Sequence, residues 1–287
     1  MRIVLITGIS GSGKSVALHM LEDTGYFCVD NLPPALLRSL VETRLKEGDA
    51  TLAVATDARS ADSLAELGKD IQSLKDEGHD VKVFFLTAST ESLITRFSET
   101  RRSHPLSHRA LANQQPNYRR TLTECIQLER EMLSGIQSLA HVIDTSNLSA
   151  NKLRSWIQEL INGTESKLTL LFESFGFKFG VPLDADMVFD VRFLPNPHYD
   201  PQLRPLTGKD AAVATFLSEL PEVDELYDDI RHFVEKWLPA FKRDNRSYLT
   251  VAIGCTGGQH RSVFIAEKLA HYFSDKEHVV VRHLQLS

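Results

Sequence analysis

The stretch Gly8-Ile9-Ser10-Gly11-Ser12-Gly13-Lys14-Ser15 decides the fold of the first half of this sequence. It fits the pattern G-x-x-x-x-G-K-[ST], whose glycines let backbone N–H groups turn inward around phosphate oxygens. The apolar run at residues 2–7 predicts a buried strand before the loop, and residues 15–22 predict a helix after it. Because a helix N-terminus carries partial positive charge, this strand, loop and helix together predict a site for phosphate groups.

The polar side chains in and around this loop have expected roles. Lys14 is predicted to reach the β- and γ-phosphates and to act in catalysis, and the Ser15 hydroxyl is predicted to occupy a Mg²⁺ position. Asp57 is the predicted acidic partner, catalytic and metal-binding, because it directly follows the apolar run 51–56. Asp30 ends a similar run and competes for this role. Either aspartate could instead cap a helix or close a turn.

The size and composition of the chain exclude several classes of protein. Its 287 residues are enough for two domains, and 42% hydrophobic with 24% charged residues is ordinary for a globular protein. The net charge of −6 argues against a general basic field for nucleic acid. Three scattered cysteines, Cys28, Cys125 and Cys255, indicate a reducing compartment. Because there is no signal peptide and no apolar run near ~18 residues, the sequence predicts a cytoplasmic protein without a membrane partner.

Strands alternate with helices through the first half of the sequence. Strands are predicted at residues 25–29, 51–56, 81–86 and 141–144. Helices are predicted at 35–46, 61–75, 90–100 (capped by Thr90), 127–139 and 150–161. This alternation predicts an α/β fold, a kinase-like P-loop domain whose parallel sheet has helices on both faces. We expect this domain to span 1–162 and a second α/β domain to span 163–287.

The second half predicts its own set of elements. The first strand is expected at residues 167–172, and further strands at 187–194 and 249–253. A phenylalanine-rich turn is expected at 172–179. Helices are expected at 210–220, 222–241 and 263–273. The helix at 222–241 is amphipathic. Its predicted core residues are Val223, Leu226, Ile230, Phe233 and Trp237.

A basic region follows the helix predicted at 90–100. Its charged residues are Arg96, Arg101, Arg102, His104, Arg109, Arg119 and Arg120, and Pro105 and Pro116 interrupt it. The pattern is typical of a lid that carries arginines onto phosphates in small nucleotide kinases. The alternative is a solvated basic helix end, which the helix dipole would favour.

A second glycine-rich loop, Gly254-Cys255-Thr256-Gly257-Gly258-Gln259-His260-Arg261-Ser262, again stands between a predicted strand and a predicted helix. This order predicts a second phosphate site. Cys255 and Arg261 also satisfy Cys-x5-Arg, the pattern of cysteine phosphatases, with Asp190 or Asp200 as the general acid. Gly254 stands where those enzymes usually carry histidine. The remaining alternative is a tight turn around a buried cysteine.

Several stretches together resemble a known family. They are residues 8–15, 26–33, 57–60, 101–106, 174–178 and 254–262. They resemble the RapZ family, bacterial P-loop nucleotide-binding proteins that are also described as RNase adapters. The resemblance implies binding and hydrolysis of ATP and GTP. It assigns ATP to residues 8–15, and GTP to Asp57, Ala58, Arg59 and Ser60.

For the second half, the resemblance implies control by an amino-sugar phosphate, contact with a small regulatory RNA and an endoribonuclease, and a homo-oligomer. The residues that match the sugar-phosphate site are Asp190, Arg192, His198, Cys255, Thr256, Gly257, Gly258, His260 and Arg261. The family's RNA role relies on a basic end, but residues 165–287 hold 14 lysines and arginines against 18 aspartates and glutamates. Two further alternatives stay open: a small-molecule kinase with a phosphate acceptor near Asp30 and the basic region, and an RNA adapter that does not depend on catalysis.

Overall fold

A computed structural model describes residues 1–56, 61–107, 120–137, 139–162, 168–243 and 248–286. The chain forms two compact units, Met1–Ile161 and Asn162–Ser287. No helix among the described residues is both long and apolar enough to cross a membrane.

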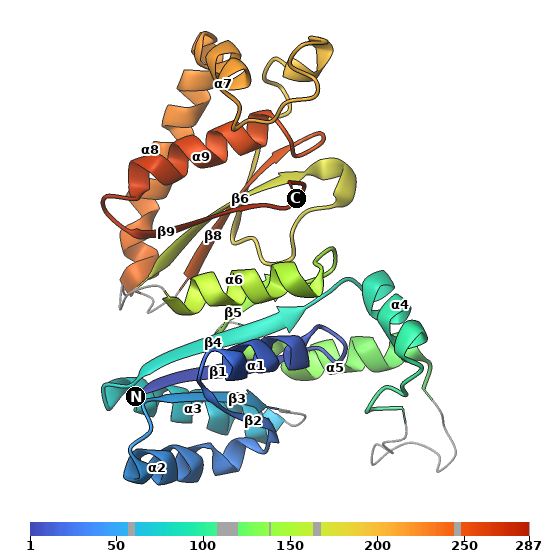
Figure 1. Cartoon of the computed structure of the whole chain (residues 1–287), viewed down its shortest axis with the longest axis vertical. Helices are drawn as coiled ribbons and strands as arrows, with labels where there is room; N and C mark the ends of the chain where they lie inside the picture. The colour runs from blue at the N-terminus through green and yellow to red at the C-terminus, as the bar shows by residue number, and fades with distance from the viewer. Residues whose placement is uncertain (57–60, 108–119, 138, 163–167, 244–247, 287) are drawn as a thin grey trace. The chain divides into compact units, whose positions relative to one another are not determined.

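The first unit is built on a parallel sheet of five described strands in the order β2-β3-β1-β4-β5 (Figure 1). The strands are β1 (Arg2–Gly8), β2 (Phe27–Leu32), β3 (Thr51–Thr56), β4 (Asp80–Thr87) and β5 (His141–Asp144). The helices are α1 (Lys14–Asp23), η1 (Pro34–Leu36), α2 (Leu37–Glu47), α3 (Ala61–Asp76), α4 (Thr90–Thr100), α5 (Leu122–Gln137) and α6 (Ala150–Asn162). The chain leads from β1 to β2 on one side of the sheet and from β4 to β5 on the other. A crevice is therefore expected at the carboxyl ends of β1 and β4.

Helices cover both faces of this sheet, as the alternation of strands and helices along the chain requires. Ile3 and Leu5 of β1 pack in one cluster with residues of α2, α3 and α5. Val4 and Ile6 point to the opposite face and are equally buried. On that face the ammonium of Lys82 donates to the last carbonyl oxygens of α6. The first half is therefore an α/β unit with helices on both faces, as predicted.

The second unit is a smaller α/β unit whose described strands form a parallel sheet in the order β7-β8-β6-β9 (Figure 1). Its strands are β6 (Thr169–Gly176), β7 (Met187–Asp190), β8 (Tyr248–Cys255) and β9 (His278–His283). Its helices are η2 (Phe177–Phe179), η3 (Pro197–Tyr199), α7 (Ala211–Ser218), α8 (Pro221–Arg243) and α9 (Arg261–Phe273). Apolar residues of α7, α8 and α9 pack with Leu170 and Phe172 of β6 in one core.

Two local predictions for the first unit were wrong. Helix α4 is capped by Ser89, whose side chain accepts a hydrogen bond from the Ser92 amide, and Thr90 is already its first helical residue. Helix α5 begins at Leu122, five residues before the predicted start. The Glu124 side chain accepts from the Thr121 amide, and the Thr121 hydroxyl accepts from the Glu124 amide, a capping box that the sequence analysis missed.

Three predictions for the second unit were also wrong. Residues 172–176, expected in a turn, continue the fully buried strand β6 between β8 and β9. Strand β7 ends at Asp190 rather than at residue 194. On α8, Val223 and Ile230 belong to the core, but Phe233 and Trp237 are each 45% exposed. Val234 and Leu238 of the same turns are buried in the core, so the buried stripe of α8 lies beside Phe233 and Trp237 rather than on them.

Candidate phosphate sites

The first glycine-rich loop lies between the end of β1 and the start of α1. Gly8 has a φ of +133° and Gly13 a φ of +105°, backbone conformations that favour glycine. A Cβ atom on Gly8 would stand 2.0 Å from the carbonyl oxygen of Leu86 on β4. The same carbonyl accepts a hydrogen bond of 3.0 Å from the Ile9 amide. The close approach of β4 therefore requires glycine at position 8.

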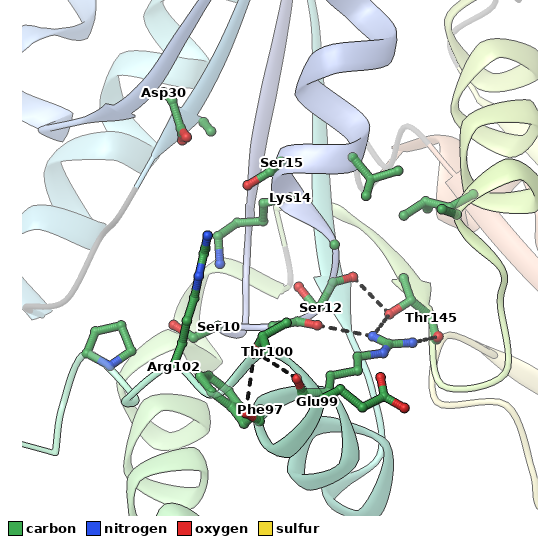
Figure 2. Close-up of a pocket in the computed structure, with 18 of the residues that line it drawn as sticks. Ser10, Ser12, Lys14, Ser15, Asp30, Phe97, Glu99, Thr100, Arg102 and Thr145 are labelled. Carbon is green, nitrogen blue, oxygen red and sulfur yellow. Dashed lines mark hydrogen bonds between the residues drawn. The ribbon is translucent and has the colours of Figure 1, made fainter.

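Lys14 is the first residue of α1, and its side chain folds back over the loop. Its ammonium donates to the carbonyl oxygen of Gly8 at 2.6 Å and to that of Ile9 at 3.1 Å. The side chain is half-buried and lines the same pocket as Ser15, whose hydroxyl is exposed (Figure 2). A charge in this position can meet an anion that enters the loop.

A pocket of about 690 Å³ opens over this loop, a size typical of small-molecule sites. Figure 2 shows Asp30 and Arg102 at one end and Thr145 at the other, with Lys14 and Ser15 between them. The lining includes apolar side chains of the α6 region, such as Leu148 and Leu153, and polar side chains such as Asp30, Asn31 and Arg102. The pocket can therefore hold a ligand with an apolar part, a phosphate chain and a polar end.

Two hydroxyl groups in this pocket are buried without a hydrogen-bond partner in the described part of the chain. They are Oγ of Ser12, in the loop, and Oγ1 of Thr56, at the end of β3. A buried hydroxyl that is unpaired in the protein costs free energy unless a ligand or water satisfies it. Both oxygens are closed off from solvent in this structure, so a polar ligand could satisfy them only after a local rearrangement. Thr56 directly precedes Asp57 and was assigned no role from the sequence.

The loop is held from behind by residues that lie far from it in the sequence. Glu129 of α5 accepts hydrogen bonds from the Ser10 amide (2.8 Å) and the Ser10 hydroxyl (2.7 Å). The Thr145 hydroxyl lies 2.9 Å from the carbonyl oxygen of Ser12. Burial raises the pKa of Glu129, but hydrogen bonds from His104 and Ser10 outweigh it, so its pKa is lowered overall.

Neither Glu129 nor Thr145 was predicted from the sequence to have a role in the site. Helix α5 carries a buried stripe of Cys125, Ile126, Glu129, Leu133 and Ile136. An acidic residue inside an apolar stripe is a signal that could have drawn attention to Glu129, because a buried charge needs partners. Thr145 directly follows β5 and has no comparable signal in the sequence.

The structure describes only one of the two aspartates that compete for the role of acidic partner. Asp57, with Ala58, Arg59 and Ser60, lies outside the described residues, so the predicted acidic partner and the implied GTP segment stay predictions. Asp30 lies in β2, two residues before its end, and lines the pocket together with Asn31. Asn31 has a φ of +56°, and the pairing of β2 with β3 shifts register between Val29 and Leu32. This irregularity places Asp30 at the edge of the pocket.

The basic region after α4 divides into residues with different surroundings. Arg102 is exposed and lines the pocket, whereas His104 is buried at 3% exposure. Arg96 also lines the pocket, but its guanidinium donates to the carbonyl oxygens of Gly11 and Thr145. Arg96 therefore braces the loop rather than extending from a lid. Arg109 and Arg119 lie outside the described residues. Arg120 donates to the Leu106 carbonyl, and Arg101 ends α4 with a φ of +51°.

The second glycine-rich loop connects β8 to α9 and is tightly hydrogen-bonded. The Cys255 thiol accepts from the Gly258 amide at 3.2 Å and lies 3.1 Å from the Ser262 hydroxyl. Burial raises the pKa of Cys255, but the hydrogen bonds from Ser262 and Gly258 and the charge of Arg261 lower it overall. This environment therefore favours the thiolate form of Cys255 more than the environment of a solvent-exposed cysteine does.

Arg261 connects this loop to the segment after β7. Its guanidinium donates to the carbonyl oxygens of Arg192 (2.6 Å) and Leu194 (2.7 Å) and to the Thr256 hydroxyl (3.3 Å). Its Nε is buried without a partner in the described chain. The rings of His198 and His260 lie 6.3 Å apart. The structure thus brings the predicted second-site residues from both segments together, and the backbone of Gly257 packs against Gly176 of β6, where a Cβ added to Gly176 would stand 2.7 Å from the Gly257 carbonyl carbon.

Asp190 and Arg192 form an exposed ion pair at the rim of this loop. Hydrogen bonds from Arg192 hold the pKa of Asp190 below its ordinary value. A general acid needs a raised pKa to carry a proton at neutral pH. Asp190 is therefore unsuited to the general-acid role of a cysteine phosphatase. Among the described residues, no group of three or more histidines, cysteines, aspartates or glutamates is placed to hold a metal ion.

The fold and the first loop define a P-loop α/β protein that carries a second α/β unit. The chain matches the RapZ-like N-terminal domain over residues 1–165 and the RapZ C-terminal domain over residues 168–287. It therefore belongs to the RapZ family, as the sequence motifs indicate.

Related proteins match along the whole chain. A "Nucleotide-binding protein" of Janthinobacterium sp. (strain Marseille) is 69% identical, and one of Thiobacillus denitrificans is 57% identical; each match covers 100% of both chains. Among solved structures, shikimate kinase from Bacteroides thetaiotaomicron is 14% identical, with a TM-score of 0.35, over 56% of this chain and 97% of that one. A gluconokinase from Sinorhizobium meliloti is 16% identical, with a TM-score of 0.34, over 56% and 94%.

Proposed function

We propose that the first unit binds ATP or GTP with Mg²⁺ in the pocket over residues 8–15 and hydrolyses it slowly. The observation that carries this proposal is the loop itself. A cation, Lys14, folds over a turn of glycines, and the hydroxyls of Ser12 and Thr56 are buried beside it without partners in the described chain. The names of the full-length relatives support the same class of ligand.

The residues present fit a Mg²⁺–nucleotide. Mg²⁺ is usually held by one or two protein oxygens together with the phosphates, so it does not need a cluster of acidic residues. Ser15 and a carboxylate, Asp57 or Asp30, would supply those oxygens, and the bound ion would neutralise charge on the phosphates. Lys14 and the loop N–H groups would orient the phosphates, and Arg102 would add positive charge from the polar end of the pocket.

Calorimetric titration with ATP and with GTP, each with Mg²⁺, tests this proposal. Lys14→Ala should weaken binding about tenfold or more, because it removes charge-assisted hydrogen bonds to phosphate. Lys69→Ala, which removes an exposed lysine of α3, is the matched control and should bind as the wild type does. Wild-type affinity in Lys14→Ala would contradict the proposal, and release of inorganic phosphate measures the hydrolysis.

A small-molecule kinase is the second candidate, because Asp30 and Asn31 line the same pocket as Lys14. A carboxylate there could accept the proton of an attacking hydroxyl. Transfer of labelled phosphate from ATP to a metabolite rather than to water would favour this candidate, and loss of that transfer in Asp30→Asn would assign the residue.

For the second unit we propose a regulatory role in which the loop of Cys255 and Arg261 binds an amino-sugar phosphate. The buried Arg261, whose Nε has no partner in the described chain, supports an anion there, and the Gly258 N–H, which donates to the Cys255 thiol, shows that the turn directs an N–H group inward. The family resemblance further suggests a homo-oligomer in the cytoplasm that contacts a small regulatory RNA and an endoribonuclease. Salt-sensitive retention of RNA on a filter tests the RNA contact.

A further inference from the structure

A single buried carboxylate joins the phosphate loop to the arginine-bearing segment 101–107. We propose that Glu129 and His104 are positioning residues that set Arg102 against the ligand of the phosphate loop. This inference rests on the proposed nucleotide site and names the residues that control how strongly that site binds its ligand. In this arrangement Arg102 contributes to ligand affinity only while Glu129 holds Ser10 and His104 together.

The contacts of Glu129 are divided between the two segments. Its Oε1 accepts from the Ser10 hydroxyl, and its Oε2 accepts both from the Ser10 amide and, at 3.2 Å, from His104 Nε2. The two side chains of the Glu129–His104 pair are 3% and 1% exposed. Burying a carboxylate is costly unless several donors satisfy it. The three donors meet this need, and they come from two segments, the phosphate loop and residues 101–107.

The ring of His104 has a defined orientation. The Leu106 amide donates to Nδ1 at 3.2 Å, so Nδ1 is the acceptor and the ring proton lies on Nε2, where it is donated to Glu129. The ring also packs on Phe97 of α4, with ring centroids 5.2 Å apart. Phe97 in turn lies against the phosphate loop, since a Cβ on Gly11 would be 3.1 Å from its ring. His104 is therefore fixed against the underside of the loop.

The position of Arg102 depends on the contact between His104 and Glu129. It lies between Arg101, which ends α4 in the left-handed conformation, and the buried His104. Figure 2 shows its side chain reaching along the pocket toward Lys14. Within the part of the chain that the structure describes, no hydrogen bond or ion pair holds its guanidinium. Its position therefore follows from the backbone on either side, and on one side that backbone is fixed by His104 and Glu129.

A double-mutant cycle separates this coupling from a merely structural role. Glu129→Gln keeps the size of the side chain but removes its charge, and in either orientation its amide N–H₂ faces at least one of the three donors of Ser10 and His104. In the wild type, Arg102→Gln should weaken the binding of a fluorescent ATP analogue about tenfold. In the Glu129→Gln background the same change should have less than about a twofold effect, because residues in one network are not additive.

The control exchanges another glutamate of the same helix. Glu131 is exposed, so in the Glu131→Gln background Arg102→Gln should keep its full effect. If Glu129→Gln fails to fold by near-ultraviolet circular dichroism, His104→Gln replaces it in the cycle. Equal effects of Arg102→Gln in all backgrounds would overturn the inference while the nucleotide site stands. Absence of binding by the wild type would instead overturn the proposed function.

Discussion

The hydroxyl of Thr145 lies 2.9 Å from the carbonyl oxygen of Ser12 and so joins the end of β5 to the phosphate loop. The same hydroxyl lies 3.0 Å from the Thr87 carbonyl oxygen and accepts a hydrogen bond from Arg96. At 1% exposure, Thr145 is a junction between the loop, β4 and α4. The floor of the pocket therefore depends on residues outside the glycine motif.

Thr145→Val should destabilise the first unit. Valine keeps the shape of the side chain but removes the hydroxyl hydrogen bonds to the buried Ser12 carbonyl and from Arg96, and the loss of the donor to Ser12 costs about 1–3 kcal/mol. Urea denaturation measures the change in the free energy of unfolding. Thr43→Val, at an exposed position of α2, is the control and should change it by less than about 0.5 kcal/mol. Equal stabilities of the two variants would show that the Thr145 junction has no energetic role.

Gly8→Ala should be far more damaging than an ordinary glycine replacement. The new Cβ would collide with the Leu86 carbonyl oxygen and would also occupy a disfavoured φ, so we expect a loss of about 3 kcal/mol or more. Gly135→Ala in α5 meets open space and should be neutral or stabilising by up to about 1 kcal/mol. Comparable unfolding midpoints for both variants would contradict the close approach of β4 to the loop.

The stability of the first unit should depend on pH through Glu129. The pKa of this carboxyl is lowered in the folded protein from an ordinary value of 4.5. A depressed pKa contributes stability that is present above the unfolded value and is lost as the pH falls through the folded value. Glu129→Gln should therefore be less stable at pH 7, and its stability should fall less steeply with decreasing pH below about 4.5.

The chain offers a clean reporter for this measurement. Its two tryptophans are Trp156, buried in the first unit, and Trp237, half-exposed in the second. In a Trp237→Phe background, fluorescence follows the unfolding of the first unit alone. Glu131→Gln in that background should keep the wild-type pH profile. A profile for Glu129→Gln that parallels the control would exclude a stabilising charge at position 129.

Cys255 should be the cysteine whose alkylation begins at the lowest pH. Its pKa is lowered, whereas burial raises the pKa of Cys28 to about 11 and also raises that of Cys125. Ser262→Ala removes a hydrogen bond to the thiol, so it should shift the pH midpoint of Cys255 alkylation upward. Mass spectrometry of the labelled peptides follows each cysteine separately. An unchanged midpoint in Ser262→Ala would show that this hydroxyl does not favour the thiolate.

The strand, loop and helix around residues 8–15 could be predicted because their causes are local. Glycines determine where the backbone can take a positive φ, and a short apolar run determines a buried strand. The same reasoning failed at residues 172–176. The phenylalanines beside Gly176 predict a turn, but pairing with β8 and β9 on both sides makes residues 172–176 part of a central strand. Strand pairing is a long-range interaction that a local window cannot contain.

The sequence by itself determined the parallel α/β architecture, the two glycine-rich loops and the family, because these follow from periodicity, spacing and motif. The tertiary structure alone decided what lies behind the first loop. Ser10 and Glu129 are 119 residues apart, and Ser12 and Thr145 are 133 apart, yet each pair is in hydrogen-bond contact. The value of a buried carboxylate or hydroxyl depends on which donors and acceptors the fold brings to it, and no residue carries that information alone.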